Sequence, residues 1–320
     1  MKQTSEFQSL IATLCDPAFD RVLIACHRAP DGDACGSAHA LSYALRCLGK
    51  SARVFCPDPF PAKFEAIFRA EQDVCAFVPE HFVTVDIAAP EMLGGADFTD
   101  RVDIVIDHHR INTVTAPLKI VNFAYASCGE IIFDILEELG VTTDAYLARC
   151  LYTAISSDTG CFRYSNTSEH TFLCAAALCR AAHPGDFWQI NRTLFETRTR
   201  TQLKLESFAA EHTRFLCDGR LAVLCVNLAL MHTLGATYEE LEILVGFIRM
   251  VEGVEVAIVL KEKEAGVFKV SVRSEETFDA SGFCQKFGGG GHLAAAGCTI
   301  RATEEEAMSA LICHAEKRLS

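Results

Sequence analysis

The chain has 320 residues, half of them apolar, and a formal charge of −13. This length can bury two hydrophobic cores, so we expect two domains. The acidic balance and the lack of a basic stripe exclude a protein that grips long nucleic acid, and no run reaches the roughly 18 apolar residues of a membrane span.

Cysteine usage and the N-terminus predict the compartment. The 16 cysteines are scattered without any C-x-x-C pair, and the first residues lack the apolar region of a signal peptide. Disulfide frameworks belong to small secreted chains, so reduced and mostly buried thiols fit this chain better. We therefore expect a soluble cytoplasmic protein that has no membrane partner.

The predicted elements of the first half alternate between strands and helices. The predicted strands are 21–26, 52–55, 82–85 and 102–106, and the predicted helices are 36–48, 63–69, 128–139, 144–156 and 168–182. The strands are short and continuously apolar, which is typical of a parallel sheet covered on both faces. Residues 1–190 are therefore predicted to form an α/β domain with a parallel sheet.

The remaining residues predict a linker and a second domain. Residues 191–217 read as a mostly helical linker, and the pattern changes at Asp218-Gly219. Strands at 221–226, 255–260 and 267–272 and helices at 238–250 and 303–319 indicate a smaller α+β domain over 218–320. It contains the glycine cluster 288–291, and the apolar residues after this cluster predict a packed helix or turn.

Acidic and imidazole side chains gather at the ends of predicted elements of the first domain. Ligands of open α/β sheets bind outside the carboxyl ends of the strands, so these side chains are aimed at one crevice. The candidates are His27, Asp31, Asp33, Asp86, Asp107, His108, His109 and Asp158.

Each of these residues also has a simpler explanation. Asp33 could cap the helix that begins near Gly36, Asp86 could form a turn, and Asp158 could belong to a helix end. Taken together, however, so many carboxylates would repel one another unless cations lay between them. A pair of divalent metal ions is the simplest resolution, and such a pair points to phosphoester hydrolysis.

The second domain carries candidate anion-binding groups. The glycine cluster followed by His292 can wrap an anion with backbone N–H groups. Arg273, at the end of a predicted strand, can bind a phosphate with its guanidinium. A flexible loop and a surface ion pair are the respective alternatives.

Together these motifs closely resemble the DHH phosphoesterase superfamily, which is named after the run found here at 107–109. The segment 288–297 is similar to the glycine-rich motif of the DHH-associated C-terminal domain. The resemblance extends from about residue 20 to about residue 315 and is greatest for the nanoRNase and 3′-phosphoadenosine 5′-phosphate phosphatase group. It implies two domains joined by a helical linker, with the active-site cleft between them.

The resemblance also implies residue roles. One metal ion would be held by His27, Asp31 and Asp86, and the other by Asp33, Asp86, His108 and Asp158. The ions would be manganese, with magnesium or cobalt as substitutes. His109 would face the scissile phosphate, with Asp107 fixing a histidine tautomer. The substrate-binding residues would be Arg273, Gly289, Gly290, Gly291, His292, Arg163 and Asn112.

The predicted activity is two-metal hydrolysis of short RNA or DNA oligonucleotides, of 3′-phosphoadenosine 5′-phosphate, or of both. A phosphodiesterase acting on cyclic or linear dinucleotides is the main alternative. A non-catalytic nucleotide sensor and an inorganic pyrophosphatase are less favoured. We expect no long duplex as partner, and the sequence is compatible with a homodimer.

Overall fold

The computed structural model describes residues 4–68, 77–275, 277–291 and 293–319. The chain divides into two compact units, Met1–Thr197 and Arg198–Ser320, and the division falls inside the linker predicted at 191–217. No helix within these described ranges is long and apolar enough to cross a bilayer.

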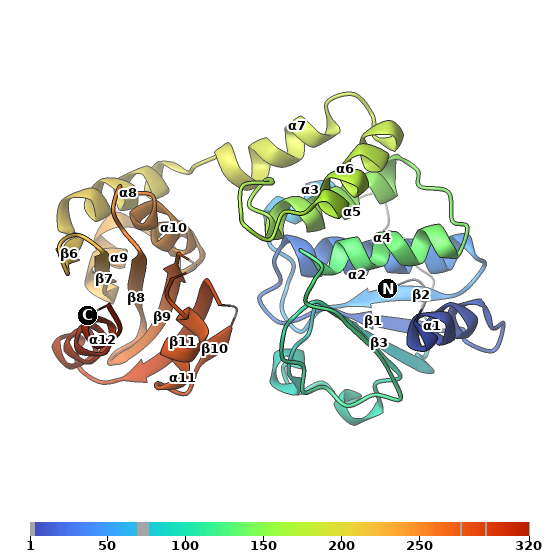
Figure 1. Cartoon of the computed structure of the whole chain (residues 1–320), viewed down its shortest axis with the longest axis horizontal. Coiled ribbons are helices and arrows are strands. Elements are labelled where there is room, and N and C mark those ends of the chain that lie inside the picture. Colours follow the sequence, from blue (N-terminus) through green and yellow to red (C-terminus); the bar gives the residue numbers. More distant parts are fainter. Residues whose placement is uncertain (1–3, 69–76, 276, 292, 320) are drawn as a thin grey trace. The chain divides into compact units, whose positions relative to one another are not determined.

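A five-stranded sheet lies at the centre of the first unit (Figure 1). Its strands are β1 (Val22–Ala25), β2 (Ala52–Phe55), β3 (His81–Val85), β4 (Ile104–Asp107) and β5 (Leu118–Val121). Their order is β2-β1-β3-β4-β5, and every neighbouring pair is parallel. β1 and β4 are buried over their whole length, as continuously apolar strands of a covered parallel sheet should be. The predicted α/β class is thus confirmed, although the sequence pattern does not predict β5.

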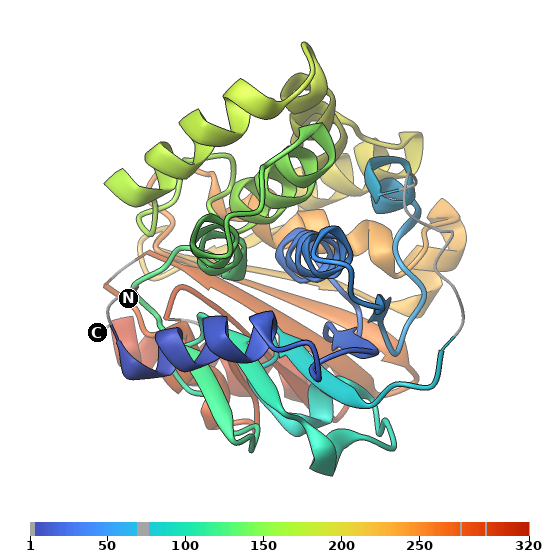
Figure 2. The same ribbon diagram turned by 90° about the vertical axis from the view of Figure 1, so that its right-hand side faces the viewer.

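Helices cover one face of this sheet in two layers. The helices are α1 (Ser5–Cys15), α2 (Gly32–Cys47), α3 (Ala62–Phe68), α4 (Cys128–Glu138), α5 (Ala145–Asp158), α6 (Glu169–Ala181) and α7 (Asp186–Asn191). α2 and α4 pack directly on the sheet and are seen nearly end on in Figure 2, and α5 and α6 lie over them. Loops and two short 3₁₀ turns, Pro90–Leu93 and Thr99–Arg101, cover the opposite face.

Two helix boundaries differ from the prediction where the site is built. The helix predicted at 36–48 begins at Gly32, because Asp31 is its N-cap and accepts a hydrogen bond from the Ala34 N–H at 3.0 Å. The helix predicted at 144–156 continues to Asp158, which therefore lies in its last turn.

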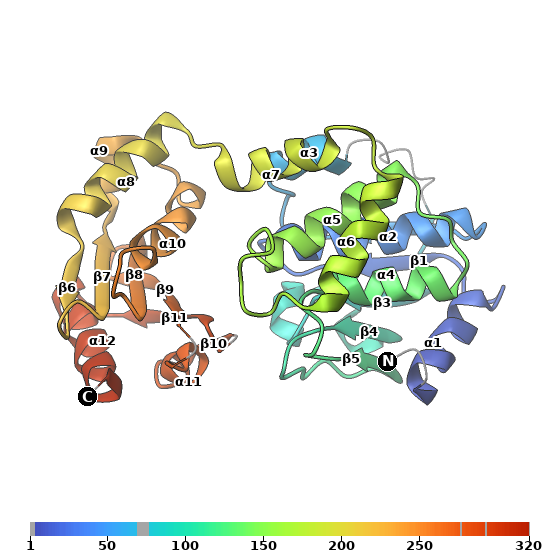
Figure 3. The same ribbon diagram turned by 45° about the horizontal axis from the view of Figure 1, so that its top comes forward.

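The second unit contains a six-stranded mixed sheet (Figure 3). Its strands are β6 (Arg214–Leu216), β7 (Leu221–Val226), β8 (Val256–Glu264), β9 (Val267–Ser274), β10 (Gly290–Gly291) and β11 (Ala295–Arg301), in the order β10-β11-β9-β8-β7-β6. Only the β7–β8 pair is parallel among these described pairings. This sheet confirms the smaller α+β domain.

Helices lie on both faces of the second sheet. They are α8 (Arg200–His212), α9 (Leu228–Leu234), α10 (Ile243–Arg249), α11 (Ala280–Gln285) and α12 (Glu304–Leu319). Alternate residues of β7 serve two cores, since Ala222 and Leu224 pack with α8 and α10 while Leu221 and Val223 pack with α11 and α12. Residues 293–294, which follow the glycine cluster, form a bend, and the strand β11 begins at Ala295. The alternative of a helix there is therefore wrong, whereas a change of chain direction is found.

Glycine lets α2 and α4 approach α5 closely. A Cβ atom at Gly36 would lie 2.3 Å from the backbone oxygen of Cys150, and one at Gly129 would lie 2.5 Å from Cβ of Ala154. Protein interiors are too tightly packed to absorb such overlaps, so these glycines set the spacing of the helices that carry site residues.

This close approach predicts the effect of one methyl group. Gly36→Ala should lower the free energy of unfolding by about 1–3 kcal/mol, because the α2–α5 contact must open. Gly246→Ala, in α10 with open space around the added Cβ, should instead be neutral or stabilising. Thermal unfolding of both variants measures the difference, and equal midpoints would contradict the tight contact.

Candidate metal centre

Three overlapping groups of side chains meet at the carboxyl edge of the parallel sheet. Within each group, one ligand atom per residue lies within 4.8 Å of the others. Asp86 and His108 each belong to two groups, so the three groups form one continuous cluster. The groups are His27, Asp31 and Asp86; Asp86, His108 and His109; and Asp33, His108 and Asp158.

Asp86 joins the two ends of the cluster. It follows β3 with a left-handed backbone, at a φ of 56°, which Asp tolerates better than most residues. Its Oδ2 atom lies 3.6 Å from Nε2 of His27, and its Oδ1 atom lies 3.5 Å from Nε2 of His108. Burial would raise the pKa of Asp86, but these imidazoles outweigh it and hold that pKa well below its usual range.

The N-terminus of α4 holds Asp33, which is fully buried. Its carboxylate accepts hydrogen bonds from the backbone N–H groups of Cys128 at 2.7 Å and Gly129 at 2.9 Å, and from the Ser37 hydroxyl at 3.0 Å. Burial, followed by the charges of Asp86 and Asp158, raises the pKa of Asp33 well above its usual range. An ionised Asp33 therefore requires positive charge nearby.

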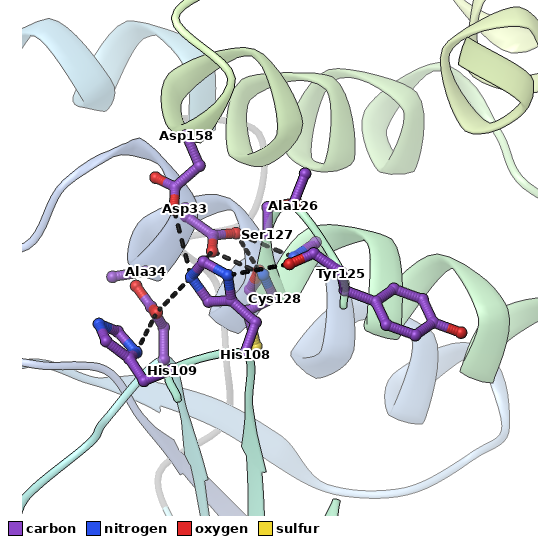
Figure 4. A network of polar contacts seen from close by, with 12 residues as sticks. Asp33, Ala34, His108, His109, Tyr125, Ala126, Ser127, Cys128 and Asp158 are labelled. Carbon is purple, nitrogen blue, oxygen red and sulfur yellow. Dashed lines mark hydrogen bonds and ion pairs between the residues drawn. The ribbon is translucent and has the colours of Figure 1, made fainter. Parts of the chain in front are cut away.

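Two histidines present the same ring nitrogen to the carboxylates. Nδ1 of His27 lies 2.8 Å from the carbonyl oxygen of Arg28, and Nδ1 of His108 lies 3.3 Å from that of Tyr125 (Figure 4). Each carbonyl favours a proton on Nδ1, which leaves Nε2 facing the acids. Metal-binding histidines are commonly oriented by such a hydrogen bond.

Asp158 completes the cluster from the last turn of α5. Its Oδ2 atom lies 3.2 Å from Nε2 of His108. Burial raises the pKa of Asp158 to about 6, against the opposing effect of His108. Because the helix continues two residues beyond its predicted end, the position of Asp158 is fixed by α5 rather than by a loop.

His109 is held differently from the other two histidines. Its Nδ1 atom lies 2.7 Å from the buried Asp107 carboxylate, which also accepts a hydrogen bond from the Asn112 amide at 2.6 Å. The Asn112 amide also donates to the carbonyl of Ile87 at 2.8 Å. The amide of Asn112, which is predicted to bind substrate, thus makes hydrogen bonds to other residues of the protein, one of them to the carboxylate oxygen of Asp107 that does not face His109.

The other predicted substrate-binding residues lie outside this cluster. Arg163 follows α5 and donates to the carbonyl of Gly160 at 2.6 Å, and Arg273 lies in β9 of the second unit. Gly289 and Gly291 allow close packing of the backbone. A Cβ at Gly289 would lie 2.1 Å from the carbonyl oxygen of Gly297, and one at Gly291 would lie 2.5 Å from that of Ala295. Gly290 belongs to β10, and His292 lies outside the described residues.

Fold and site together define a two-unit α/β protein with a candidate dinuclear metal centre. Two family models match the chain, the N-terminal domain of the DHH family at residues 21–155 and the DHHA1 domain at residues 219–320. The chain belongs to the DHH family, as its motifs predict.

Curated relatives match almost the whole chain. The bifunctional oligoribonuclease and PAP phosphatase NrnA of Thermus thermophilus is 32% identical, over 92% of this chain and 89% of its own length. The Bacillus subtilis protein of the same name is 24% identical, over 90% of this chain and 91% of its own length. An exopolyphosphatase-related protein from Bacteroides fragilis has the same fold, with a TM-score of 0.87, 21% identity and coverage of 98% and 96% of the two chains.

Proposed function

We propose that this chain hydrolyses phosphoester bonds of short oligonucleotides and of 3′-phosphoadenosine 5′-phosphate. The observation that carries the proposal is the joined cluster of four carboxylates and three imidazoles at the carboxyl edge of the sheet. Support comes from a relative that is 32% identical over nine tenths of the chain and is named for both activities. The small substrates also agree with a chain of charge −13.

The cluster has the chemistry of a site for two divalent cations. Oδ1 of Asp86 is buried and accepts no hydrogen bond from any residue that the structure describes. Mixed oxygen and imidazole ligands suit manganese, and also magnesium or cobalt. Bound ions would lower the pKa of a water molecule and polarise the phosphoryl oxygens.

The ligand sets follow the two ends of the cluster. We assign one ion to His27, Asp31 and Asp86, and the other to Asp33, His108 and Asp158, with Asp86 shared. Nδ1 of both histidines faces a backbone carbonyl, so each ring would bind through Nε2. The N-terminus of α4 would keep Asp33 in place through its two N–H donors.

His109 is the candidate general acid. Nδ1 is directed at the Asp107 carboxylate, so the second ring nitrogen, Nε2, would be the atom that donates a proton to the oxygen that leaves phosphorus. Asn112 fixes Asp107 from behind by its amide hydrogen bond. Arg163 of the first unit and Arg273 and 289–291 of the second remain candidates for binding the substrate.

The shared ligand predicts a loss of function at one position. Asp86→Asn keeps a residue that tolerates the left-handed backbone, so the fold should be retained. Substituting a residue that only hydrogen-bonds to a metal ligand typically lowers activity by up to roughly 100-fold, and the loss for Asp86→Asn should be larger. Calorimetry should also detect weaker manganese binding. The control is Asp100→Asn, an exposed aspartate on a 3₁₀ turn of the same unit, which should change neither. Near-normal activity of Asp86→Asn with manganese would contradict the shared role.

The substrate class is tested with one panel and one metal. Purified protein with manganese should release mononucleotides from dinucleotides and pentanucleotides and phosphate from 3′-phosphoadenosine 5′-phosphate. A chelator should abolish both reactions, and added manganese should restore them. Long oligonucleotides and pyrophosphate should be poor substrates. Preferential cleavage of cyclic dinucleotides would favour the phosphodiesterase alternative, and no release from any compound would indicate a nucleotide sensor.

A further inference from the structure

An arginine and an exposed aromatic ring form a pair on two chain segments that adjoin the candidate metal centre. The Phe123 side chain is 62% exposed, and the guanidinium carbon of Arg110 lies 4.9 Å from the centre of its ring. Arg110 has no carboxylate partner within the described parts of the chain, although the chain contains 42 acidic residues. Its positive charge is therefore not neutralised locally by an ion pair.

The backbone places this pair next to the cluster. Arg110 directly follows His109, and Phe123 lies in the loop that follows β5. In that loop the Asn122 N–H donates to the carbonyl of Asp107 at 3.0 Å, and the carbonyl of Tyr125 lies 3.3 Å from Nδ1 of His108. Phe123 thus lies between Asn122, whose backbone contacts the residue before His108, and Tyr125, whose backbone contacts His108 itself.

Such a pair has the chemistry of a nucleotide-binding surface. Nucleobases stack on aromatic rings and on guanidinium planes, and arginine also binds phosphate oxygens. Single exposed aromatic side chains are common on protein surfaces. Phe123 differs from a single exposed aromatic residue in two respects. Its loop adjoins the cluster, and its ring contacts an arginine that has no acidic partner among the described residues.

We propose that Arg110 and Phe123 form the subsite for a nucleotide that adjoins the scissile phosphate. Its base stacks on the Phe123 ring, and Arg110 binds a phosphate oxygen of the same nucleotide. The proposal rests on the proposed function and adds a place where a base is recognised.

The experiment removes the ring and the base separately. Phe123→Ala should lower kcat/KM for a dinucleotide about 5- to 150-fold, mainly through KM, which corresponds to the roughly 1–3 kcal/mol per stacked base found by alanine substitution. Two further dinucleotides each lack one base. For the one that lacks the stacked base, the variant and the wild type should have similar kcat/KM. Phe123→Trp should retain activity on the intact dinucleotide.

The matched control is Trp188→Ala. Trp188 is 59% exposed and has the Arg192 guanidinium carbon 5.4 Å from its ring, but α7 contributes no residue to the cluster. It should leave all three reactions unchanged. An unchanged kcat/KM for Phe123→Ala, or an equal loss on all three dinucleotides, would refute the subsite. A wild-type protein that cleaves no dinucleotide would instead refute the proposed function.

A second inference concerns a buried carboxylate that the proposed chemistry does not use. Asp134, in α4, is 3% exposed and accepts a hydrogen bond from the Tyr125 hydroxyl at 2.6 Å. Nε2 of His170, in α6, lies 3.4 Å from its other oxygen. Burying a charge costs free energy unless the charge is paired. We therefore expect this network to stabilise a specific part of the structure.

The network holds the segment that positions two cluster residues. The carbonyl of Tyr125 faces Nδ1 of His108, and three residues later the chain begins α4, whose first N–H groups hold Asp33 (Figure 4). Between them, the Ala126 N–H donates to the buried Glu130 carboxylate at 3.0 Å. Residues 125–129 therefore form one rigid segment behind the ligands assigned to a single ion.

We infer that Asp134 and the Tyr125 hydroxyl are positioning groups for that ion. By anchoring Tyr125, Asp134 keeps the carbonyl in reach of His108 and so keeps Nε2 directed at Asp33 and Asp158. Loss of the hydroxyl should loosen the carbonyl without removing any ligand. This inference also rests on the proposed ligand sets.

Two matched variants separate positioning from general stability. Tyr125→Phe and Tyr43→Phe each lose a tyrosine–aspartate hydrogen bond of the first unit, at 2.6 Å to Asp134 and 2.5 Å to Asp144. Manganese titration by calorimetry should show one of two ions bound about 10- to 100-fold more weakly in Tyr125→Phe. Tyr43→Phe should bind both ions like the wild type, while both metal-free variants unfold at similarly lowered temperatures.

The outcomes are distinguishable. Wild-type manganese affinity in Tyr125→Phe would refute the positioning role and leave the ligand sets intact. Equal weakening in both variants would mean that binding responds only to overall stability, which would also refute it. A wild-type protein that binds no manganese would refute the metal site itself.

Discussion

The first unit is organised around a crowding of negative charge. Four carboxylates meet at the carboxyl ends of β1 and β3 and the end of α5, and two of them, Asp33 and Asp86, are almost inaccessible to water. Like charges at this separation in a protein interior repel strongly unless cations or protons lie between them. The imidazoles provide part of the balance, and the backbone donors of α4 provide another. This balance explains why a strand end, a helix start and a helix end must converge on one point.

The surrounding fold makes that convergence rigid. Parallel strands bring their carboxyl ends to one edge, and glycines at the α2–α5 and α4–α5 contacts let the helices approach to the distance that the cluster requires. The second unit contributes a separate sheet whose glycine hairpin is explained by close strand pairing, since a side chain at Gly289 would overlap the opposite backbone. A glycine-rich motif therefore does not by itself indicate an anion site.

The sequence predicts the side chains of the cluster because most of them directly follow short apolar segments, and such segments can be recognised without knowledge of tertiary contacts. It predicts neither β5, a half-buried edge strand, nor the role of Cys128 and Gly129, whose backbone N–H groups carry no sequence signal. The sequence pattern places the start of α2 near Gly36, because it does not distinguish Asp31 from Asp33 as the capping residue. The structure shows that Asp31 is the cap. The helix α1 is also not among the predicted elements, although its buried residues Phe7, Leu10 and Leu14 recur at helical spacing. The ligand set of each ion depends on distances between side chains, which the order of residues along the chain does not give.

The dual use of Asp31 affects how related sequences should be interpreted. This residue caps α2 as well as facing His27, and replacing such a cap typically costs about 0.5–2 kcal/mol. A descendant that lost its chemistry would still be under selection to keep an aspartate here, as it would at Asp33, which holds the start of α4. Retention of these two acids is therefore weak evidence that a homologue is active. His27, which makes no comparable contact with a helix end, is the more informative position for recognising inactive members of the lineage.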